Sequence, residues 1–516
     1  MLKELFECCN TMIYQNEKNI IKTEFGDWQT PLELAQRICL LISKQITPDL
    51  IVEPNCGIGA FLQAAINIFP HARRILGLDI NPDYVQAARS MRNNGNLEVI
   101  QGDFFAYDWK CLNEFKGPVL ILGNPPWVTN AELMRIKSSN IPMKANFNGL
   151  NGMEAITGKS NFDISEWMLI KETELLQDKE ALLSMLCKTT VARKVLSYVW
   201  KNTLRFSTAE MRLINARQYF GVAVDACLLL IRFQPGLDRE NNVCEIFNSL
   251  EDEYPSSTLG FYRGQLVSQI DRVNKYADFI ATKPSLFCWR SGIKHDCSKV
   301  MELKKLPDGY FINGFNELVE IEKDLLFPMH KSSDLANGRE NISKYMLVPQ
   351  CVVGSDTKFI ASVYPKMWKY LLLHEELFDK RKSSIYSGKP KFSIFGVGDY
   401  TFLPWKVAIS GLYKNLNFRI IGPYEGKPVV FDDTCYFLSF KFKEEAVMIK
   451  DILESNICFE IFKMLIFWDS KRPVTKDVLN SLNLPAISQF LGREKEFKER
   501  FPAFFEHQQL PLLESL

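Results

Sequence analysis

The chain has 516 residues, 47% of them hydrophobic and 24% charged, which excludes a globally disordered protein. It is longer than one hydrophobic core usually supports, so we expect two or three domains. Its 62 basic and 61 acidic residues leave a formal charge of +1, so any contact with nucleic acid must come from local basic patches.

The 13 cysteines and 5 histidines argue against a disulfide framework and against a metal site. No Cys-x-x-Cys pair occurs, so we expect buried free thiols and no bound metal. The sequence has neither an apolar run of about 18 residues nor an N-terminal signal peptide. We therefore expect a cytoplasmic protein without a membrane segment.

Helical and strand patterns alternate through the N-terminal half. The first helix is predicted over residues 31–45, with Thr30 as its N-cap and Pro31 as its first helical residue. Strands follow at 50–52, 75–78, 97–100, 119–122, 181–186, 213–214 and 226–233, with helices over 60–68 and 82–91. This alternation predicts a doubly wound α/β sheet.

The pattern becomes less regular after Phe233, where aromatic residues, lysines and short strand-like pieces are mixed. We place a domain boundary in the region 236–260, where residues 255–257 fit a short linker, and take residues 1–240 and 241–516 as the two domains. The C-terminal domain is predicted to be mixed α/β.

A polar residue ends or follows each of four predicted strands, namely Glu53, Asp79, Asp103 and Asn124. Ligands of such sheets bind outside the carboxyl ends of the strands. Each carboxylate taken alone could be an ordinary loop residue, whereas polar residues at four strand ends predict a cofactor cleft.

The turn after the first strand, Gly57-Ile58-Gly59, lets the backbone approach a ligand closely. Leu62 stands where a dinucleotide-binding motif would have its third glycine, which argues against a pyrophosphate. A carboxylate at the strand end, Glu53, suits a positively charged amine and suits a phosphate badly.

Asp79 and Asp103 complete the pattern expected for an adenosine. Asp79 lies 22 residues after Gly57, the position at which an acidic side chain binds the hydroxyls of a ribose. Asp103 can accept a hydrogen bond from an adenine amine, and Phe104 can stack on the adenine ring. An amine, a ribose and an adenine without a phosphate describe S-adenosylmethionine.

Asn124-Pro125-Pro126-Trp127 follows the fourth strand. Two successive prolines remove two N–H donors and stiffen the chain. The Asn124 side-chain oxygen and a main-chain carbonyl can therefore accept both hydrogens of a planar amine, while Trp127 stacks on the attached ring. Such a string alone is also common in turns, but beside a cofactor cleft it predicts a site for the exocyclic amine of a flipped-out nucleobase.

With these motifs in this order, the sequence from about Phe25 to Phe233 resembles the gamma class of amino-methylating DNA methyltransferases, the modification enzymes of type II restriction–modification systems. The resemblance implies a Rossmann-like catalytic domain that binds S-adenosylmethionine, followed by a DNA target-recognition domain. It implies cofactor contacts from Thr30, Glu53, Asn55, Cys56, Gly57, Asp79, Asp103 and Phe104, and catalytic contacts from Asn124, Pro125, Pro126 and Trp127.

The same resemblance implies the target base. Asn124 points to N6 of adenine, whereas Ser or Thr at this position would point to N4 of cytosine. Trp127 replaces the Tyr or Phe that is usual in the family and keeps the stacking surface. Phe220 is similar to the family's second aromatic that packs on the flipped base, whereas for Trp167 we favour core packing.

Two basic stretches of the C-terminal half, residues 289–299 and 380–392, resemble target-recognition regions. We expect contacts with double-stranded DNA from Lys294, Lys380, Arg381, Lys382 and Lys389. A solvated basic face is the alternative for any single lysine.

Three alternative functions stay open: a related methyltransferase acting on RNA or a protein glutamine, the methylase part of a bifunctional restriction enzyme, and a non-catalytic DNA-binding module. The size and basic stretches of the C-terminal half favour a reader of duplex DNA, and the four strand-end residues favour catalysis. A cognate restriction endonuclease, acting separately, would be the partner in such a system.

Overall fold

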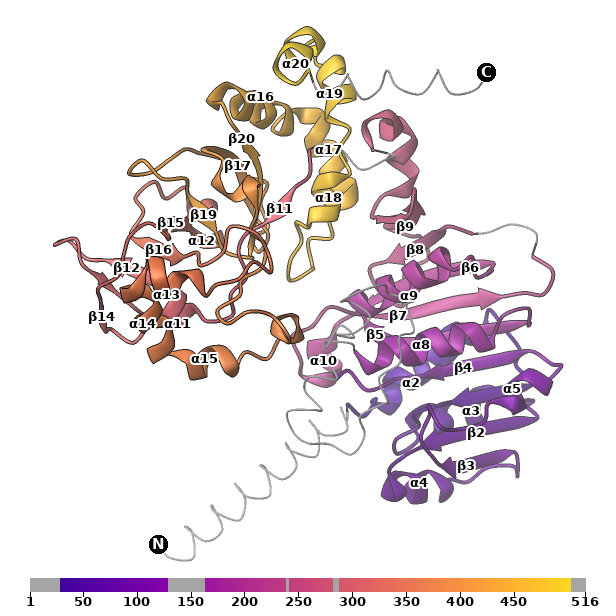
Figure 1. The fold of residues 1–516 in the computed structure, drawn as a ribbon. Helices are drawn as coiled ribbons and strands as arrows, with labels where there is room; N and C mark the ends of the chain where they lie inside the picture. Colours follow the sequence, from indigo (N-terminus) through magenta and orange to yellow (C-terminus); the bar gives the residue numbers. More distant parts are fainter. Residues whose placement is uncertain (1–27, 129–162, 238–240, 282–286, 503–516) are drawn as a thin grey trace, which may run out of the picture. The chain divides into compact units, whose positions relative to one another are not determined.

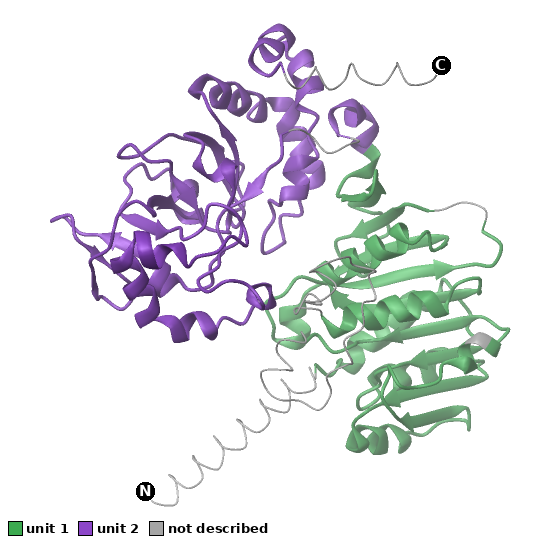
Figure 2. Ribbon diagram, viewed as in Figure 1, with its two compact units in different colours: residues 1–271 green, residues 272–516 purple. Residues whose placement is uncertain are grey.

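The computed structural model describes residues 28–128, 163–237, 241–281 and 287–502 (Figure 1). It divides into two compact units, Met1–Asp271 and Arg272–Leu516 (Figure 2). From the sequence we place the boundary between residues 240 and 241, but the first unit continues to Asp271, because three further strands extend its sheet.

The first unit is built on a ten-stranded sheet with the order β10-β9-β8-β6-β7-β5-β4-β1-β2-β3. Its strands are β1 (Leu50–Glu53), β2 (Arg74–Asp79), β3 (Leu97–Gln101), β4 (Val119–Gly123), β5 (Ala181–Lys188), β6 (Thr208–Ile214), β7 (Ala226–Phe233), β8 (Val243–Phe247), β9 (Ser257–Tyr262) and β10 (Gln265–Val267). Strands β1 to β5 are parallel, and β7 runs antiparallel between β5 and β6. The predicted Rossmann-like α/β class is confirmed.

Helices cover both faces of this sheet (Figure 1). They are α2 (Leu32–Ser43), α3 (Ala60–Ile68), α4 (Pro82–Arg89), α5 (Lys110–Glu114), α8 (Ile164–Leu175), α9 (Thr189–Lys201) and α10 (Ala216–Phe220). A 3-10 segment over Ile270–Phe279 spans the boundary between the two units. One core cluster joins α2 and α3 to the sheet, and α8 packs with α9 beside β5.

The chain changes direction at β1, and this change positions the site. From β1 it adds β2 and β3 on one side, and then returns to add β4 on the other side. A crevice forms at such a switch point, outside the carboxyl ends of the two central strands. Here those ends are Glu53 of β1 and Gly123 of β4.

Two predicted boundaries in this unit need correction. The first helix begins at Leu32 with Pro31 as its N-cap residue, so Thr30 does not cap it. Strand β6 begins at Thr208, well before the predicted start at residue 213. Its apolar pattern is broken by Glu210 and Arg212, which form a salt bridge of 2.8 Å, and the prediction missed the strand for that reason.

The second unit is mixed α/β, as predicted, with two separate sheets. A four-stranded sheet has the order β11 (Arg290–Ser291), β20 (Cys435–Phe440), β17 (Trp405–Ser410) and β18 (Arg419–Ile421). A six-stranded sheet has the order β14 (Leu318–Val319), β13 (Phe311–Ile312), β12 (Glu302–Lys305), β16 (Lys344–Leu347), β15 (Leu326–His330) and β19 (Val430–Phe431).

Short helices surround these sheets. They are α11 (Ser298–Met301), α12 (Ser332–Asn337), α13 (Phe359–Val363), α14 (Pro365–Leu373), α15 (Glu375–Asp379), α16 (Lys443–Leu453), α17 (Asn456–Leu465), α18 (Lys476–Asn480), α19 (Leu484–Phe490) and α20 (Glu494–Arg500), with 3-10 turns at Ser384–Tyr386 and Asp399–Phe402. None of the helices in the described ranges is long and apolar enough to cross a membrane.

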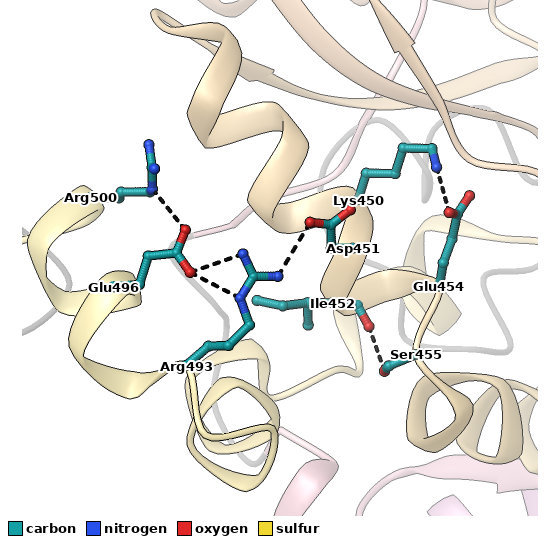
Figure 3. Close-up of polar contacts among 8 residues, drawn as sticks. All are labelled: Lys450, Asp451, Ile452, Glu454, Ser455, Arg493, Glu496 and Arg500. Atoms are coloured by element: carbon teal, nitrogen blue, oxygen red, sulfur yellow. Dashed lines mark hydrogen bonds and ion pairs between the residues drawn. The ribbon is translucent and has the colours of Figure 1, made fainter.

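A network of charged side chains links α16 to α20 (Figure 3). Arg493 lies between Asp451 at 3.3 Å and Glu496 at 2.9 Å, and Glu496 also accepts from Arg500 at 3.2 Å. These side chains are partly exposed, and exposed pairs contribute only about 0–1 kcal/mol each. The network therefore adds little to the stability of the unit.

Lys406 of β17 is fully buried, and its ammonium donates to the Leu403 carbonyl at 2.6 Å. Burial lowers the pKa of Lys406 to about 7, whereas an unfolded lysine titrates near about 10.4. The unfolded chain thus binds the extra proton between these pH values, and the stability of the second unit rises with pH over that interval.

We expect Lys406→Met to remove this rise. The unfolding free energy of the variant relative to the wild type should be highest near pH 7 and should fall by a few kcal/mol towards pH 10, at roughly 1.4 kcal/mol per pKa unit. Chemical denaturation at several pH values measures this difference. If the unfolding free energies of the two proteins change in parallel with pH, Lys406 stays charged in the folded state.

Candidate active site

The structure brings four predicted polar residues to one edge of the sheet. Glu53 and Asp79 are the last residues of β1 and β2, Asn124 directly follows β4, and Asp103 lies two residues beyond the end of β3. Because these strands are parallel, their carboxyl ends share this edge. The polar side chains therefore lie around the switch point, where such folds bind their ligands.

The Asn124 side chain is held in one orientation by its amide nitrogen. Nδ2 donates to the Trp28 carbonyl at 2.9 Å and to the Thr30 hydroxyl at 3.2 Å. Oδ1 is buried and has no hydrogen-bond partner among the described residues. A buried acceptor without a donor is costly, so this oxygen fits a ligand that brings its own N–H group.

Thr30 thus lies beside Asn124, at the start of the chain segment that the resemblance links to the cofactor. Its oxygen accepts the Asn124 amide hydrogen, which leaves the hydroxyl hydrogen for another acceptor. Residues 25–27 of the same predicted motif lie outside the described residues.

Trp127 and Phe220 come together from distant parts of the sequence. Their ring centroids are 5.2 Å apart with an interplanar angle of 68°, and both rings are buried. Phe220 ends the short helix α10, whose N-cap Asn215 accepts from the Gln218 amide. The rings touch edge to face, so a base can stack between them only after they separate.

The glycine turn after β1 requires a left-handed backbone at Gly57 and Gly59, which have φ values of +51° and +89°. A Cβ atom on Gly57 would lie 2.6 Å from Oε1 of Gln29, and one on Gly59 would lie 2.3 Å from Cε of Met91. Because both contacts are with the ends of flexible side chains that can move aside, the backbone conformation is what requires glycine at the two positions.

Asp79 joins this turn to β2. Its two carboxylate oxygens accept main-chain N–H groups, Oδ2 from Gly57 at 2.8 Å and Oδ1 from Asn81 at 2.8 Å. A carboxylate has about four acceptor positions. Asp79 is thereby fixed in place, and its carboxylate lies at the carboxyl end of β2, where the ribose contact is predicted.

Glu53 is a buried carboxyl with only 3% of its surface exposed. Burial raises its pKa well above the usual range; the Leu62 N–H, which donates to Oε2 at 3.0 Å, opposes this shift, and the nearby Asp79 charge adds to it. No cation pairs with Glu53 among the described residues. A buried carboxyl that lacks a counter-charge fits a positively charged ligand.

Asn55 and Cys56, two further residues of the predicted cofactor contacts, differ in whether their side chains can bind a ligand. Asn55 Oδ1 is buried without a partner among the described residues, so it can accept from a ligand. The Cys56 thiol packs in the core beside Gly77, and burial raises its pKa. Cys56 therefore contributes packing and main chain to the loop, and its thiol is unreactive.

At the predicted adenine end, Asp103 is exposed and its Oδ1 accepts the Phe105 N–H at 2.9 Å. Phe104 is only 5% exposed because it packs on Trp109, whereas Phe105 is 38% exposed. The half-buried Trp167 lies edge-on to Phe105 at 6.2 Å. Phe105 is thus a further aromatic at this end, which we missed because the adjacent Phe104 satisfies the same motif.

Lys188 is a second residue that we missed from the sequence. It ends β5, and its ammonium donates to the Trp127 carbonyl at 2.9 Å and to the Asp163 carboxylate at 2.7 Å. Nothing local in the sequence signals this contact, because Lys188 lies 61 residues after Trp127.

The predicted DNA-contact residues of the second unit are in unequal environments. Lys380 pairs with Glu376 at 3.1 Å, and Lys294 pairs with Asp296 at 3.6 Å. Arg381 donates to the carbonyls of Phe378, His295 and Ser393, at 3.0, 3.3 and 2.7 Å. Arg381 is thus already engaged in holding its own segment together.

Lys382 and Lys389 remain exposed, with no ion pair to another described residue. Both line a cavity of about 340 Å³, together with the hydroxyl residues Ser383, Ser384 and Ser387 and the acidic residues Glu375 and Asp379. Ammonium and hydroxyl groups around a cavity suit a phosphate oxygen. These two lysines are therefore the strongest of the five predicted DNA contacts.

The site can now be compared with known proteins. No protein-family model matches the chain. The type II methyltransferase M.NspV of Nostoc sp. is 44% identical to it over 486 residues, which cover 93% of this chain and 100% of the relative. The chain belongs to the type II methyltransferases. As a member of this family of restriction–modification enzymes, it transfers a methyl group from S-adenosylmethionine to DNA.

Two further similarities accompany this one. The type II methyltransferase M.CvrRI of Paramecium bursaria Chlorella virus XZ-6E is 31% identical over 143 residues, 28% of this chain and 35% of that protein. A solved structure of the Type IIL restriction-modification enzyme MmeI in complex with DNA has a TM-score of 0.45 and 13% identity, covering 96% of this chain and 78% of that chain.

The predicted family, its methyl donor and its DNA substrate are thereby confirmed. The residues at the sheet edge fit the donor of a type II methyltransferase. Within the part of the chain that the structure describes, Glu53 lacks a counter-charge and Asn55 Oδ1 lacks a partner, while Asp79 presents fixed carboxylate oxygens. These features match a ligand with positive charge, a ribose and no phosphate.

Proposed function

We propose that this type II methyltransferase modifies N6 of a flipped-out adenine at a specific site in duplex DNA, and so protects host DNA from a cognate endonuclease. A cytoplasmic location, where host DNA is found, belongs to the same proposal. One observation carries the choice of an amine as target: the unpaired, buried Oδ1 of Asn124 at the end of β4.

The chemistry follows from the properties of an aromatic amine. Its lone pair is delocalised into the ring, which makes the nitrogen a poor nucleophile. Two hydrogen bonds, to Asn124 Oδ1 and to the Pro125 carbonyl, would favour a tetrahedral nitrogen with a localised lone pair. They would also stabilise the positive charge that develops on that nitrogen.

The sulfonium of S-adenosylmethionine supplies an activated methyl group, so this chain's residues need only bind, orient and exclude water. In this scheme Glu53, Asp79, Asp103 and Thr30 hold the donor, and Asn124 with Pro125 holds the amine in line with the methyl group. Alignment of this kind contributes several kcal/mol to the acceleration of a bimolecular step.

The amine of cytosine N4 could donate the same two hydrogen bonds. Adenine is favoured because the family resemblance associates Asn at position 124 with N6-adenine. Modification of RNA or of a protein glutamine has no specific support in the described residues, and the family assignment points to DNA.

The decisive experiment is to express the chain in a host that lacks its own DNA methylases and to analyse that host's DNA. Mass spectrometry of the hydrolysed nucleosides should reveal N6-methyladenine, and single-molecule sequencing should place it at one short motif. N4-methylcytosine in place of N6-methyladenine would refute the choice of base and would leave the amine mechanism intact.

We propose that the second unit reads DNA and that Lys382 and Lys389 contact backbone phosphates. Replacing both by Ala should weaken binding uniformly across sequences. It should also reduce the slope of log Kd against log salt by about 2, at roughly 0.9 per lost phosphate contact. Fluorescence anisotropy with duplex DNA at several salt concentrations measures both effects.

Lys380→Ala is the matched control, because that lysine is in the same segment but is already paired with Glu376. It should change the salt slope by well under one. A double variant at Lys382 and Lys389 that keeps the wild-type slope would place the phosphate contacts elsewhere.

A further inference from the structure

The Asn124–Trp127 turn has an unusual requirement for external support. Pro125 and Pro126 have no N–H group, so two consecutive residues of the turn cannot donate a main-chain hydrogen bond. The turn must therefore be held through its carbonyl groups and side chains. Asn124 is held by Trp28 and Thr30, as described above, and the other end of the turn needs a separate donor.

Lys188 supplies that donor. It is the last residue of β5, the neighbour of β4 in the sheet, and Gly123 of β4 is in register with Met185. Lys188 therefore lies just beyond the end of β4, at the edge where the turn leaves the sheet. Its ammonium contacts both the Trp127 carbonyl and the Asp163 carboxylate.

Asp163 anchors this contact to α8. It is the N-cap residue of that helix, and its Oδ1 accepts the Ser165 N–H at 3.2 Å and the Ser165 hydroxyl. A second tie lies directly beside it, because the Ile164 N–H donates to the Val128 carbonyl at 3.0 Å. The turn is thus fastened to both β5 and α8.

The charges in this arrangement are largely withdrawn from solvent. The side chains of Lys188 and Asp163 are 22% and 7% exposed. Each charge neutralises the other, so the pair provides a strong charge-assisted donor at Trp127 without placing net positive charge beside the turn. Net positive charge there would oppose the positive charge that develops on the target amine.

We propose that Lys188 is a positioning residue that acts through the Trp127 carbonyl and, paired with Asp163, holds the Asn124–Trp127 turn in the geometry needed for methyl transfer. This inference rests on the proposed role of that turn in binding the target amine. Misplacement of a reacting group by about 1 Å can cost up to about 10²-fold in rate, so loss of this contact should act on the chemical step.

The test compares Lys188→Met, Lys188→Arg, Asp163→Asn and the double variant Lys188→Met with Asp163→Asn. The readouts are the single-turnover rate of labelled methyl transfer to duplex DNA, the Kd for S-adenosylmethionine and the Tm. Lys188→Met should lower the rate by about 10- to 100-fold, with the Kd changed less than about threefold. Lys188→Arg should recover most of the rate, because a guanidinium can donate to both partners.

The double variant should lose much less than the product of the two single losses, since both remove the same contact. Lys194→Met is the matched control. Lys194 also pairs with a buried carboxylate of α8, Glu166 at 2.6 Å, and among the described contacts the bond to the Trp127 carbonyl comes from Lys188 and not from this pair. It should leave the transfer rate within about twofold of the wild type while lowering the Tm by an amount similar to Lys188→Met.

Equal rate losses for Lys188→Met and Lys194→Met, or no recovery with Lys188→Arg, would overturn the proposal and assign Lys188 a general structural role. If Lys188→Met does not fold, the other two single variants provide the test. A lowered rate for Asp163→Asn with a rate near the wild type for Lys188→Arg would support the proposal. An unchanged rate for Asp163→Asn would overturn it. Labelled methyl is counted in DNA whichever base receives it, so a wrong choice of adenine would not disturb this test.

Discussion

Asn124→Ala should lower the single-turnover rate of methyl transfer by about 10²- to 10³-fold, the loss typical when one preorganised polar contact to a developing charge is removed. The variant loses the buried Oδ1 that lacks a partner in the described structure. The Kd for S-adenosylmethionine should change little, because Glu53 and Asp79 stay in place. Rapid-quench measurements with labelled donor and separate calorimetric titrations distinguish the two effects.

Asn124→Asp separates the acceptor from the donor function of the same side chain. The carboxylate keeps an oxygen for the amine but can no longer donate to the Trp28 carbonyl. We expect its rate to lie between those of the wild type and Asn124→Ala. Equal rates for Asn124→Asp and Asn124→Ala would mean that the tie to Trp28 and Thr30 matters more than the acceptor.

Asn96→Ala is the control for loss of an asparagine from this sheet. Asn96 resembles Asn124 in its bonding, since its Nδ2 donates to the Ala72 carbonyl at 2.8 Å and its Oδ1 lacks a described partner. It precedes β3, however, and so lies at the amino edge of the sheet. Its replacement should leave the transfer rate within about twofold, since it touches no part of the site.

The positions of Glu53, Asp79 and Asn124 in the fold can be predicted from the sequence because the signals for them are local. A run of apolar residues followed by a polar residue marks the end of a buried parallel strand, and Glu53, Asp79 and Asn124 all lie where that pattern places them. The two glycines of the turn after β1 are similarly local, because each is required by its own backbone angle.

Contacts between distant segments carry no such signal. The bond from Lys188 to Trp127 depends on β5 lying beside β4, which only the assembled sheet determines. Strands β8 to β10 were assigned to the wrong side of the boundary because they are short and follow an irregular segment. We predict Arg381 as a DNA contact, and its bond to the His295 carbonyl, 86 residues away, has no signal in the local sequence.

The buried carboxyl of Glu53 lowers the stability of the folded protein as pH rises, but the same carboxyl is predicted to bind the cofactor. Burial keeps the pKa of its carboxyl raised, whereas an unfolded glutamate titrates near about 4.3. The folded state therefore holds the proton more tightly. The stability that this group contributes is fully present below about pH 4.3, and it is lost as pH rises through the folded pKa.

We expect Glu53→Gln to raise the unfolding free energy of the free enzyme at neutral pH and to weaken binding of S-adenosylmethionine about 10- to 100-fold. The size of the second effect is that of a lost hydrogen bond to a charged group. Glutamine keeps an oxygen for the Leu62 N–H but cannot carry the negative charge that a cationic ligand requires. The stability gain over wild type should increase as pH rises from about 4.3.

Glu172→Gln is the control that separates the two consequences. Glu172 of α8 is also a buried carboxyl whose pKa is raised by burial, and neither of its carboxyl oxygens has a described partner. Its replacement should raise stability with the same dependence on pH, but should leave the Kd for S-adenosylmethionine unchanged. If both variants weaken binding equally, the effect arises from the core of the unit and Glu53 does not contact the donor. If only Glu53→Gln weakens it, and a proton is released on binding by the wild type and by Glu172→Gln but not by Glu53→Gln, then the ionised Glu53 carboxylate faces the positive charge of the methyl donor.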